Sequence, residues 1–344
     1  MTASFKSAVA LGVDIGGTFV KTALVGPGPA VLERARLTMD PGEPAEALLR
    51  RLSGTLYGLE ALVEGRPALP VGVGCAGLID ARTGVVRTSP NLPLWRDVPL
   101  VAALSEGLAV HRAGPPETRT ATEAGRTARV VLDNDANVFS FAEGFFGAAR
   151  DAANAVFVTL GTGVGGGLKL DGRLYTGSCG FAGEIGHITI DPDGPVCACG
   201  NRGCLESFVG SGSIVRRARK MIEDEGRQNE WLSSGLSSLD ELTAEDVGRA
   251  AQAGDALATR VFGEAGEHLG VALAGVVNLL NPEVVVLGGG VSKAGEPLFS
   301  AVRSTVLRRA LGLSSRCVRI VPALLGEDAG VIGAAMKAAG SGGS

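Results

Sequence analysis

One short stretch of the chain gathers side chains that bind metal ions. The segment GHITIDPDGPVCACGNRGCLE, residues 186–206, holds one of the three histidines and three of the six cysteines of this 344-residue chain. His187, Cys197, Cys199 and Cys204 supply a Cys₃His set, and four such ligands make a closed tetrahedral zinc site. A catalytic zinc site would keep one position open for water. The number of ligands therefore favours a structural Zn²⁺ ion.

Two other interpretations of this segment stay open. A labile disulfide between two of the three thiols would leave an odd cysteine and give His187 no role. A histidine packed in the core is the second alternative. Cys75, Cys179 and Cys317 stand apart among apolar or small residues, and we expect each of them to be a buried packing residue.

Two glycine turns have the composition of phosphate-binding loops. In DIGGT, Gly16 and Gly17 can leave successive amides pointing at an anion, while Asp14 and Thr18 add a carboxylate and a hydroxyl. This pattern suits a phosphate and its Mg²⁺ ion. LGTGVGGG, residues 160–167, offers Thr162 and Gly163 in a comparable setting. The alternative is a tight β-hairpin whose glycines serve only the turn, but a pair of such turns favours phosphate held from two sides.

A carboxylate follows a β-rich run in LDNDAN, residues 132–137. The run ends at Asn134 and Asp135, and a strand end at the junction of two lobes can present a catalytic carboxylate. The alternative is an Asx turn that only terminates the strand.

The elements that must position these residues follow from glycine punctuation and apolar periodicity. Two comparable strand–turn–strand units open two halves of the chain, and a mostly helical region follows the second. The predicted strands cover 8–17, 18–26, 70–75, 128–133, 154–172 (two strands and their turn) and 283–292, and the predicted helices lie in 45–65 and 205–281, with an N-cap at Thr243. Residues 111–127 and 223–238 are expected to be loops or insertions, and 340–344 a disordered tail.

Composition limits the classes of function. With 45% hydrophobic residues the chain can bury a large core in two lobes, and a net charge of −4 provides no basic field for nucleic acid. The N-terminus lacks a full signal-peptide core, and the longest other apolar run, residues 269–280, is shorter than the roughly 20 residues of a membrane span. We therefore expect a cytoplasmic protein with a small-molecule partner, no nucleic acid and no membrane.

Six ordered motifs resemble those of the ROK family, named for repressors, open reading frames and kinases. They are VGVGCAGLID (71–80), SPNLPLW (89–95), LDNDANVFSFAEG (132–144), AGEIGHITID (182–191), CACGNRGCLE (197–206) and VVVLGGGVS (284–292). The resemblance runs from Leu11 to about Ala338. It implies an α/β, two-lobed fold of the actin-like and ribonuclease H-like kind, with the active site in the cleft between the lobes. The N-terminal lobe would be 1–135, completed by a helix at 329–339, and the C-terminal lobe 136–328 with the zinc motif.

Within this family, residues 186–206 and PNLPLWRDVPL (90–100) are most similar to ATP-dependent glucokinases. The resemblance implies phosphorylation of glucose at the 6-hydroxyl by ATP and Mg²⁺ in a homodimer or homotetramer, with Asp135 as general base. The implied sugar ligands are Asn91, Asn134, Asp135, Glu184, His187 and Glu206. The implied nucleotide site is Asp14, Gly16, Gly17, Thr18, Thr162, Gly163, Gly289 and Gly290, and the implied metal ligands are His187, Cys197, Cys199 and Cys204.

Three rival functions remain. The first is a kinase for N-acetylglucosamine, N-acetylmannosamine, mannose or fructose. The second is a sugar-sensing repressor or a non-catalytic sensor; the acidic balance and the lack of a helix-turn-helix segment before the first hairpin count against a repressor, and Asp14 and Asp135 against a silent sensor. The third, a zinc hydrolase, is disfavoured by the closed ligand set.

Overall fold

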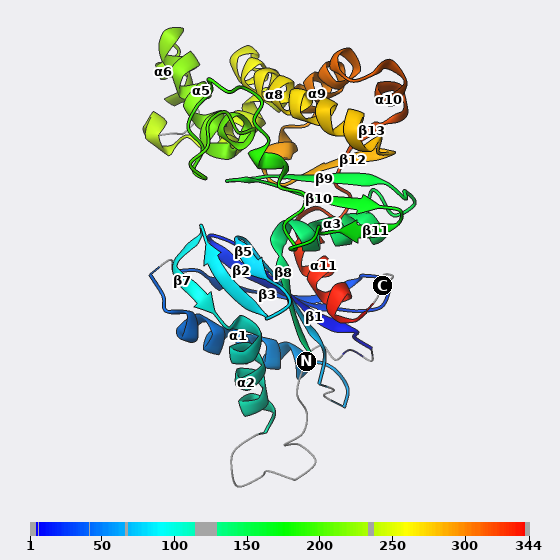
Figure 1. Ribbon diagram of the computed structural model, residues 1–344. Coiled ribbons are helices and arrows are strands. Elements are labelled where there is room, and N and C mark those ends of the chain that lie inside the picture. The colour runs from blue at the N-terminus through cyan, green and yellow to red at the C-terminus, as the bar shows by residue number, and fades with distance from the viewer. Residues whose placement is uncertain are drawn as a thin grey trace. The chain divides into compact units, whose positions relative to one another are not determined.

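The computed structural model describes residues 5, 7–40, 42–65, 68–113, 129–232 and 237–340 (Figure 1). The chain forms two compact units: unit 1 comprises Met1–Arg150 and Glu327–Ser344, and unit 2 comprises Asp151–Gly326. From residue 114 on, the expected insertion at 111–127 lies outside the described residues, as does the expected tail from residue 341 on.

Unit 1 is built on a five-stranded sheet in the order β3-β2-β1-β4-β8. β1 (Ala10–Ile15), β2 (Phe19–Val25) and β3 (Val31–Thr38) are antiparallel, whereas β4 (Val71–Cys75) and β8 (Val130–Asn134) continue from β1 in parallel. A second, three-stranded sheet contains β5 (Leu78–Asp80), β6 (Val85–Ser89) and β7 (Leu92–Val98). The helices of unit 1 are α1 (Ala45–Glu60), α2 (Leu100–Arg112), α3 (Asp135–Phe145) and α11 (Ala329–Ala338).

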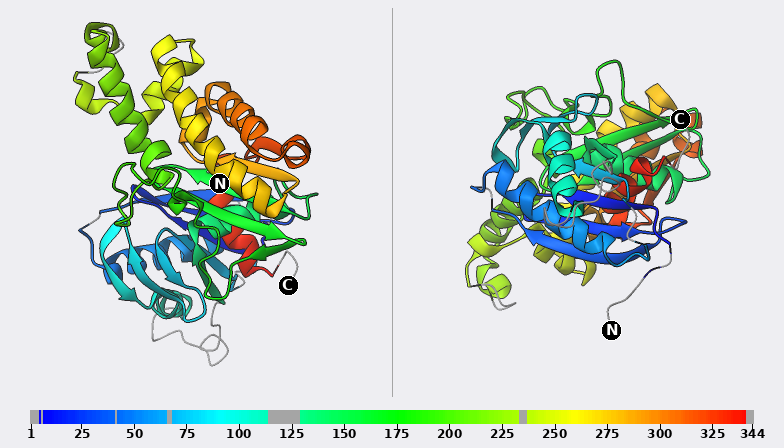
Figure 2. Two further views of the ribbon diagram at one scale, coloured as in Figure 1. Left: turned by 45° about the horizontal axis from the view of Figure 1, so that its top comes forward. Right: turned by 90° about the horizontal axis from the view of Figure 1, so that it is seen from below.

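Alternation of side chains along β1 explains how helices cover both faces of this sheet. Leu11 and Val13 point into the apolar core that α1 and α2 share. Gly12 and Gly72 lie on the other face, where α11 packs on the sheet (Figure 2). A Cβ atom at Gly12 would lie 1.9 Å from the carbonyl oxygen of Val331, so only glycine lets α11 approach the strands this closely.

Unit 2 repeats the sheet pattern in the order β11-β10-β9-β12-β13. β9 (Ala155–Leu160), β10 (Val164–Leu170) and β11 (Arg173–Tyr175) are antiparallel, and β12 (Val284–Gly288) and β13 (Arg319–Pro322) are parallel to β9. The long helix α8 (Ala256–Leu280) packs along α9 (Glu296–Arg309) over this sheet (Figure 2). The other α-helices are α4 (Glu206–Val209), α5 (Ser211–Asp224), α6 (Gln228–Leu232), α7 (Ala244–Gln252) and α10 (Gly312–Cys317).

The structure confirms the two glycine hairpins, the helix that begins at Ala45, the helix that begins at Ala329 and the N-cap at Thr243, where Asp246 completes a capping box. It adds elements that were not expected: the strands β3, β11 and β13, the sheet β5-β6-β7, the helices α2, α3, α9 and α10, and α6 inside the predicted loop at 223–238. α6 forms there because Trp231 is buried and anchors the segment to the core of unit 2.

The division between the units falls after Arg150, whereas the sequence placed it after Asp135. Helix α3 explains the difference, because it follows β8 directly and packs against α11. Both of those elements belong to unit 1.

The expectation of buried packing holds for Cys75, but it is wrong for Cys179 and Cys317, which are exposed. Apolar residues near them in the sequence are also exposed: Phe181 near Cys179 is 44% exposed, and Leu313 near Cys317 is 83% exposed. Apolar neighbours in the sequence therefore did not indicate burial at these two positions.

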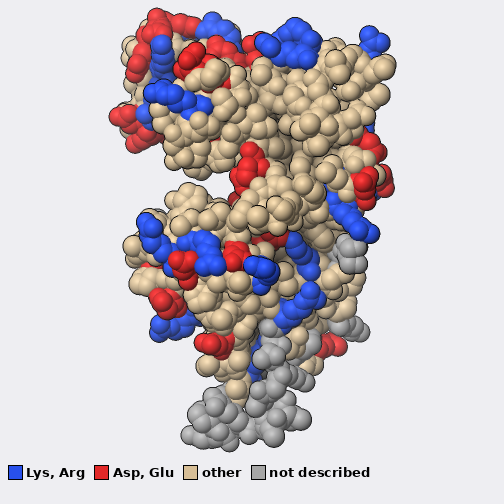
Figure 3. Space-filling view, in the orientation of Figure 1, with Lys and Arg blue, Asp and Glu red and all other residues tan. Residues whose placement is uncertain are grey.

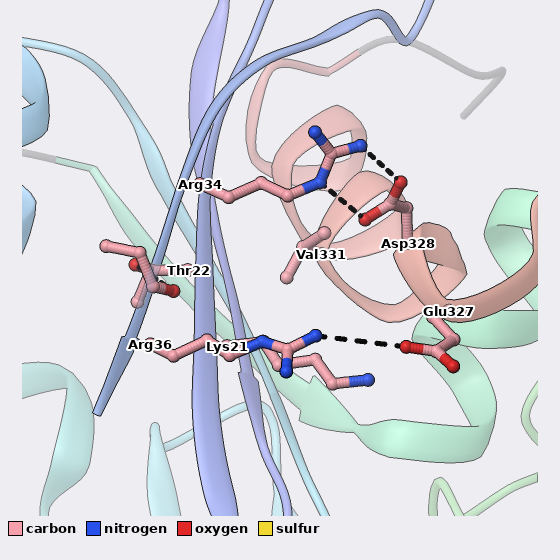
Figure 4. A pocket seen from close by; sticks show the side chains of 8 residues that line it. Lys21, Thr22, Arg34, Arg36, Glu327, Asp328 and Val331 are labelled. Atoms are coloured by element: carbon pink, nitrogen blue, oxygen red, sulfur yellow. Dashed lines mark hydrogen bonds and ion pairs between the residues drawn. The ribbon is translucent and has the colours of Figure 1, made fainter. Parts of the chain in front are cut away.

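Charged side chains of both signs are interspersed on the face shown in Figure 3. Two ion pairs join the chain before α11 to β3 (Figure 4). Arg34 donates to both carboxylate oxygens of Asp328, at 3.1 and 2.6 Å, and Arg36 lies 3.8 Å from Glu327. Among the described helices, none has the length and apolar character that crossing a membrane requires.

Candidate functional site

Three parallel strands of unit 1 end side by side. Ile15 is paired with Cys75, and Cys75 with Asn134, so β1, β4 and β8 leave the sheet at one edge. With neighbouring strands about 4.8 Å apart, the ends of β1 and β8 lie about 10 Å from one another. The DIGGT turn and Asp135 therefore share the carboxyl edge of this sheet, where ligands of open α/β sheets commonly bind.

The start of α3 holds Asp135 in a defined place. Asn134 is the N-cap, and its side-chain oxygen accepts hydrogen bonds from the amides of Ala136, at 2.8 Å, and Asn137, at 3.4 Å. Its Nδ2 donates to the carbonyl of Gly77 at 3.2 Å. Asp135 is half-buried in the first helical turn.

Asp133 is a buried residue of this site that the sequence analysis missed. Its Oδ1 accepts from the amide of Asn134 at 2.7 Å and from Nδ2 of Asn137 at 2.8 Å, while its Oδ2 pairs with Lys337 of α11. Asp133 thus joins β8, α3 and α11 directly before the candidate base. In the sequence, only the four-residue spacing between Asp133 and Asn137 indicated that these two side chains could form a hydrogen bond.

Asp14 lies at the opposite end of the shared edge. Desolvation raises the pKa of its carboxyl group above the ordinary value, and the charge of Lys21 opposes this shift. The first turn of α11 crowds the carboxylate, because a Cβ atom at Gly330 would lie 2.7 Å from Oδ2 of Asp14. A hard oxygen ligand withdrawn from bulk water fits Mg²⁺.

The turn after Asp14 is open to solvent at Gly17 and Thr18. The predicted sugar ligand Asn91 lies beside it, since a Cβ atom at Gly17 would be 3.3 Å from Oδ1 of Asn91. Cys75 sits in the middle of the edge, where burial raises the pKa of its thiol and keeps it neutral. Unit 1 therefore brings together all of its predicted residues: Asp14, Gly16, Gly17, Thr18, Asn91, Asn134 and Asp135.

In unit 2, the predicted nucleotide residues meet at the ends of two parallel strands. Gly288 of β12 pairs with Thr159 of β9, so the strands end together. Gly289 has φ +86°, and a Cβ atom on it would lie 2.3 Å from the carbonyl oxygen of Leu160. This close approach sets Gly289 and Gly290 beside the turn that carries Thr162 and Gly163.

The cysteine segment folds into a compact cluster. Short pairings between the chain after His187 and the chain before Glu206 hold it, with hydrogen bonds of 2.9 Å from the amide of Ile190 to Gly203 and from that of Leu205 to Ile188. Gly203 has φ +67°, and a side chain there would collide with the carbonyl of Asp191.

His187, Cys197, Cys199 and Cys204 form this Cys₃His cluster, and their ligand atoms all lie within 4.8 Å of one another. The Sγ atoms of Cys199 and Cys204 are 3.7 Å apart, and Sγ of Cys197 is 3.8 Å from Nδ1 of His187. A zinc ion with Zn–S bonds of about 2.3 Å requires ligand separations of about 3.6 to 3.8 Å. These two separations match that range, and the identity and number of the donors suit a tetrahedral Zn²⁺ site. All six cysteines are free, which gives no support to the disulfide alternative.

Two carboxylates flank the cluster in different surroundings. Glu184 is exposed directly before the short 3₁₀ helix Ile185–His187. Glu206 is half-buried at the start of α4, and its Oε2 accepts from the amide of Val164 at 2.9 Å. Unit 2 therefore places Thr162, Gly163, Glu184, His187, Glu206, the cysteines and the Gly289–Gly290 pair around the starts of β10 and α4 and the end of β12.

Comparison with known proteins extends over nearly the whole chain. The sequence model described as the ROK family matches residues 10–113 and 118–340. A curated glucokinase of Thermotoga maritima is 35% identical over 94% of this chain and 95% of its own length. A xylose repressor of Caldicellulosiruptor bescii is 29% identical over 94% of this chain and 76% of its own length.

Among solved structures, a ROK family glucokinase from Streptomyces griseus in complex with glucose and AMPPNP superposes with a TM-score of 0.79. It is 30% identical, and the match covers 95% of this chain and 98% of that one. The likeness confirms the predicted α/β fold with two lobes of the actin-like kind.

Proposed function

The chain belongs to the ROK family, and we propose that it transfers the γ-phosphoryl group of ATP to the 6-hydroxyl of glucose. The observation that carries the proposal is the edge of unit 1, where paired strand ends set a glycine turn and Asp135 about 10 Å apart. That distance leaves room for a phosphoryl group and a sugar hydroxyl between the turn and the carboxylate.

Asp135 is the general base of the proposed reaction. As the O6–phosphorus bond forms and the bond from the γ-phosphorus to the β-phosphate oxygen breaks, the O6 proton passes to Asp135 and ADP leaves. The ordinary pKa of an aspartate, about 3.9, lies far below that of an alcohol, so the proton moves only as O6 bonds to phosphorus. Catalysis then depends on orientation, which the capped start of α3 supplies.

The phosphates of ATP are bound by backbone amides. Gly16, Gly17 and Thr18 supply them from unit 1, and Thr162 and Gly163 from unit 2, while Gly289 and Gly290 lie near the adenosine. Mg²⁺ bound with the nucleotide would neutralise phosphate charge, and Asp14 is the residue that would hold it.

Glucose is recognised through hydrogen bonds to its hydroxyl groups, and a site built in this way rejects sugars that leave its polar groups unpaired. Asn91, Asn134 and Asp135 serve in unit 1, and Glu184, His187 and Glu206 in unit 2. Zn²⁺ would be held by His187 through Nδ1 and by the three cysteines, which leaves Nε2 of His187 for a sugar hydroxyl.

A coupled assay for ADP tests this proposal. We expect kcat/KM to be highest for glucose among glucose, mannose, fructose, N-acetylglucosamine and N-acetylmannosamine, with glucose 6-phosphate as the product. No turnover of glucose, or a higher kcat/KM with another of these sugars, would overturn the assignment of substrate.

A second candidate is a sugar-binding regulator without catalysis, which the similarity to a xylose repressor favours. The same assay separates the two, because a regulator binds a sugar in calorimetry but releases no ADP. The predicted homodimer or homotetramer stays a prediction that sedimentation analysis can test.

A further inference from the structure

Glu206 makes contacts that a sugar ligand alone would not need. Its Oε2 accepts a hydrogen bond from the amide of Val164 at 2.9 Å, across 42 residues of sequence. Its Oε1 lies 3.6 Å from Sγ of Cys197, a member of the Cys₃His cluster. One carboxylate therefore touches both the metal-binding cluster and the turn between β9 and β10.

Backbone hydrogen bonds also hold the turn. The amide of Gly161 donates to Gly163 within the turn at 2.9 Å, and the carbonyl of Gly161 accepts from Ser211 at the start of α5 at 2.8 Å. Thr162 and Gly163 are exposed at its tip, whereas Val164 is buried. The bond from Glu206 thus fixes the first residue after the tip.

The contact leaves no room for a side chain at Gly163. A Cβ atom there would lie 2.7 Å from Oε2 of Glu206, closer than real Cβ atoms approach an oxygen. Because this bond joins the turn to the start of α4, across 42 residues of sequence, it can set the position of the turn.

We propose that Glu206 is a positioning residue that couples the Cys₃His cluster to the phosphate-binding turn at Thr162 and Gly163. Metal binding at the cluster fixes the segment that carries Glu206, which follows the ligand Cys204 by two residues. Glu206 then orders the turn, and the ordered turn binds nucleotide more tightly. The coupling to nucleotide rests on the proposed kinase function, whereas the mechanical link between cluster and turn does not.

Amide hydrogen exchange of the peptide covering residues 160–168 tests the mechanical link without any ligand. For Glu206→Ala we expect exchange about tenfold faster there, because the amide of Val164 loses its acceptor. Glu206→Gln keeps an acceptor and should stay close to wild type. Glu184→Ala is the matched control, since Glu184 flanks the same cluster but has no bond to the turn among the described contacts, and it should leave this peptide unchanged.

Gly163→Ala disturbs the same contact from the turn, because the added Cβ atom would displace the carboxylate of Glu206, and it leaves the cysteines intact. This variant therefore tests the proposal even if Glu206→Ala is poorly folded. We expect faster exchange of residues 160–168 with full zinc content. Unchanged exchange in both Glu206→Ala and Gly163→Ala would overturn the proposal.

Removal of zinc with a chelator tests the coupling. In wild type, we expect faster exchange at 160–168 and a dissociation constant for AMPPNP, measured by calorimetry without glucose, that rises about tenfold. In Glu206→Ala the chelator should add little, because the link is already broken. Equal and additive effects in the two proteins would contradict coupling through Glu206.

Failure of the kinase proposal is distinguishable. If the wild-type protein binds no AMPPNP, the proposed function fails while the exchange data still decide the link. If it phosphorylates glucose but chelation leaves residues 160–168 protected, only the coupling is contradicted.

Discussion

The two units carry the same sheet, an antiparallel ribbon of three strands continued by two parallel strands, with a glycine turn between corresponding strands. In unit 1 the turn follows Asp14, which supplies its own carboxylate. The corresponding residue of unit 2, one before the last of β9, is Thr159, and the carboxylate at that turn is Glu206 from α4. The same sheet pattern thus carries an aspartate before the turn in unit 1 and a threonine before the turn in unit 2, where Glu206 of α4 supplies the carboxylate.

This difference assigns separate tasks to the units. Unit 1 places Asp14 and Asp135 at one edge, so we assign the proton transfer and the magnesium ion to it. Unit 2 places the Cys₃His cluster and Glu206 beside its turn, so we assign to it a positioning role for nucleotide and sugar, which it shares with the ligands proposed in unit 1. The predictions below test this division, from the largest expected effect to the smallest.

Asp135→Asn should have the largest effect. Loss of the general base is expected to lower kcat by about 10² to 10⁴ while the dissociation constant for glucose changes little, because the amide keeps the shape of the side chain. Steady-state kinetics and calorimetry measure the two quantities. Asp171→Asn, in the exposed turn after β10, is the control and should retain wild-type kcat. A wild-type kcat in Asp135→Asn would show that Asp135 is not the general base.

Cys199→Ser should have the second-largest effect on activity. We expect loss of zinc and a decrease in kcat/KM for glucose of about 10- to 100-fold, since His187 and Glu206 lose their fixed support. Metal analysis and sugar titration measure this. Cys317→Ser changes an exposed thiol outside the cluster and should have neither effect. A metal-free variant with unchanged sugar affinity would contradict the role of the cluster.

Asp14→Asn should raise the thermal stability of the protein and lower its kcat. The raised pKa of Asp14 means that folding opposes its ionisation, a cost present above the folded pKa and absent below the ordinary value near 3.8. The variant should therefore have a higher Tm than wild type at pH 7, and this advantage should vanish as the pH falls toward 4. Its kcat should drop, because the variant lacks the carboxylate that we propose as the magnesium ligand. Thermal unfolding across this pH range would contradict the account if the difference in Tm were constant.

The ion pair of Arg34 and Asp328 should have the smallest effect. Its side chains are 57% and 33% exposed, and exposed pairs contribute about 0.2 to 1 kcal/mol. A double-mutant cycle with Arg34→Ala and Asp328→Ala, measured by denaturant unfolding, should return a coupling free energy in that range. A much larger coupling free energy would contradict the account, because it would mean that this ion pair stabilises the segment before α11 strongly.

The sequence predicted the parts of this comparison that depend on local pattern. Apolar runs ending in glycine turns predicted both hairpins, and four candidate ligands in one segment predicted the cluster, because both features are formed by residues that are close in sequence. β3 was missed because VLERARLT is a charged edge strand whose partner, β2, is what makes it a strand.

Contacts between distant residues could not be predicted in this way. The bond from Glu206 to Val164 and the pair of Asp133 with Lys337 depend on how α4 and α11 pack, which no short pattern records. The exposure of Cys179 and Cys317 was missed for the same reason, since burial is decided by elements far along the chain.

The rate of product formation at saturating ATP and glucose tests the division of tasks most directly. In Asp135→Asn we expect kcat to stay at least about 100-fold below wild type however much ligand is added, because the chemical step itself is impaired. In zinc-depleted Cys199→Ser we expect saturating ligands to restore kcat to within about tenfold of wild type, because only positioning is lost. Recovery in Asp135→Asn together with a persistent defect in Cys199→Ser would contradict the account.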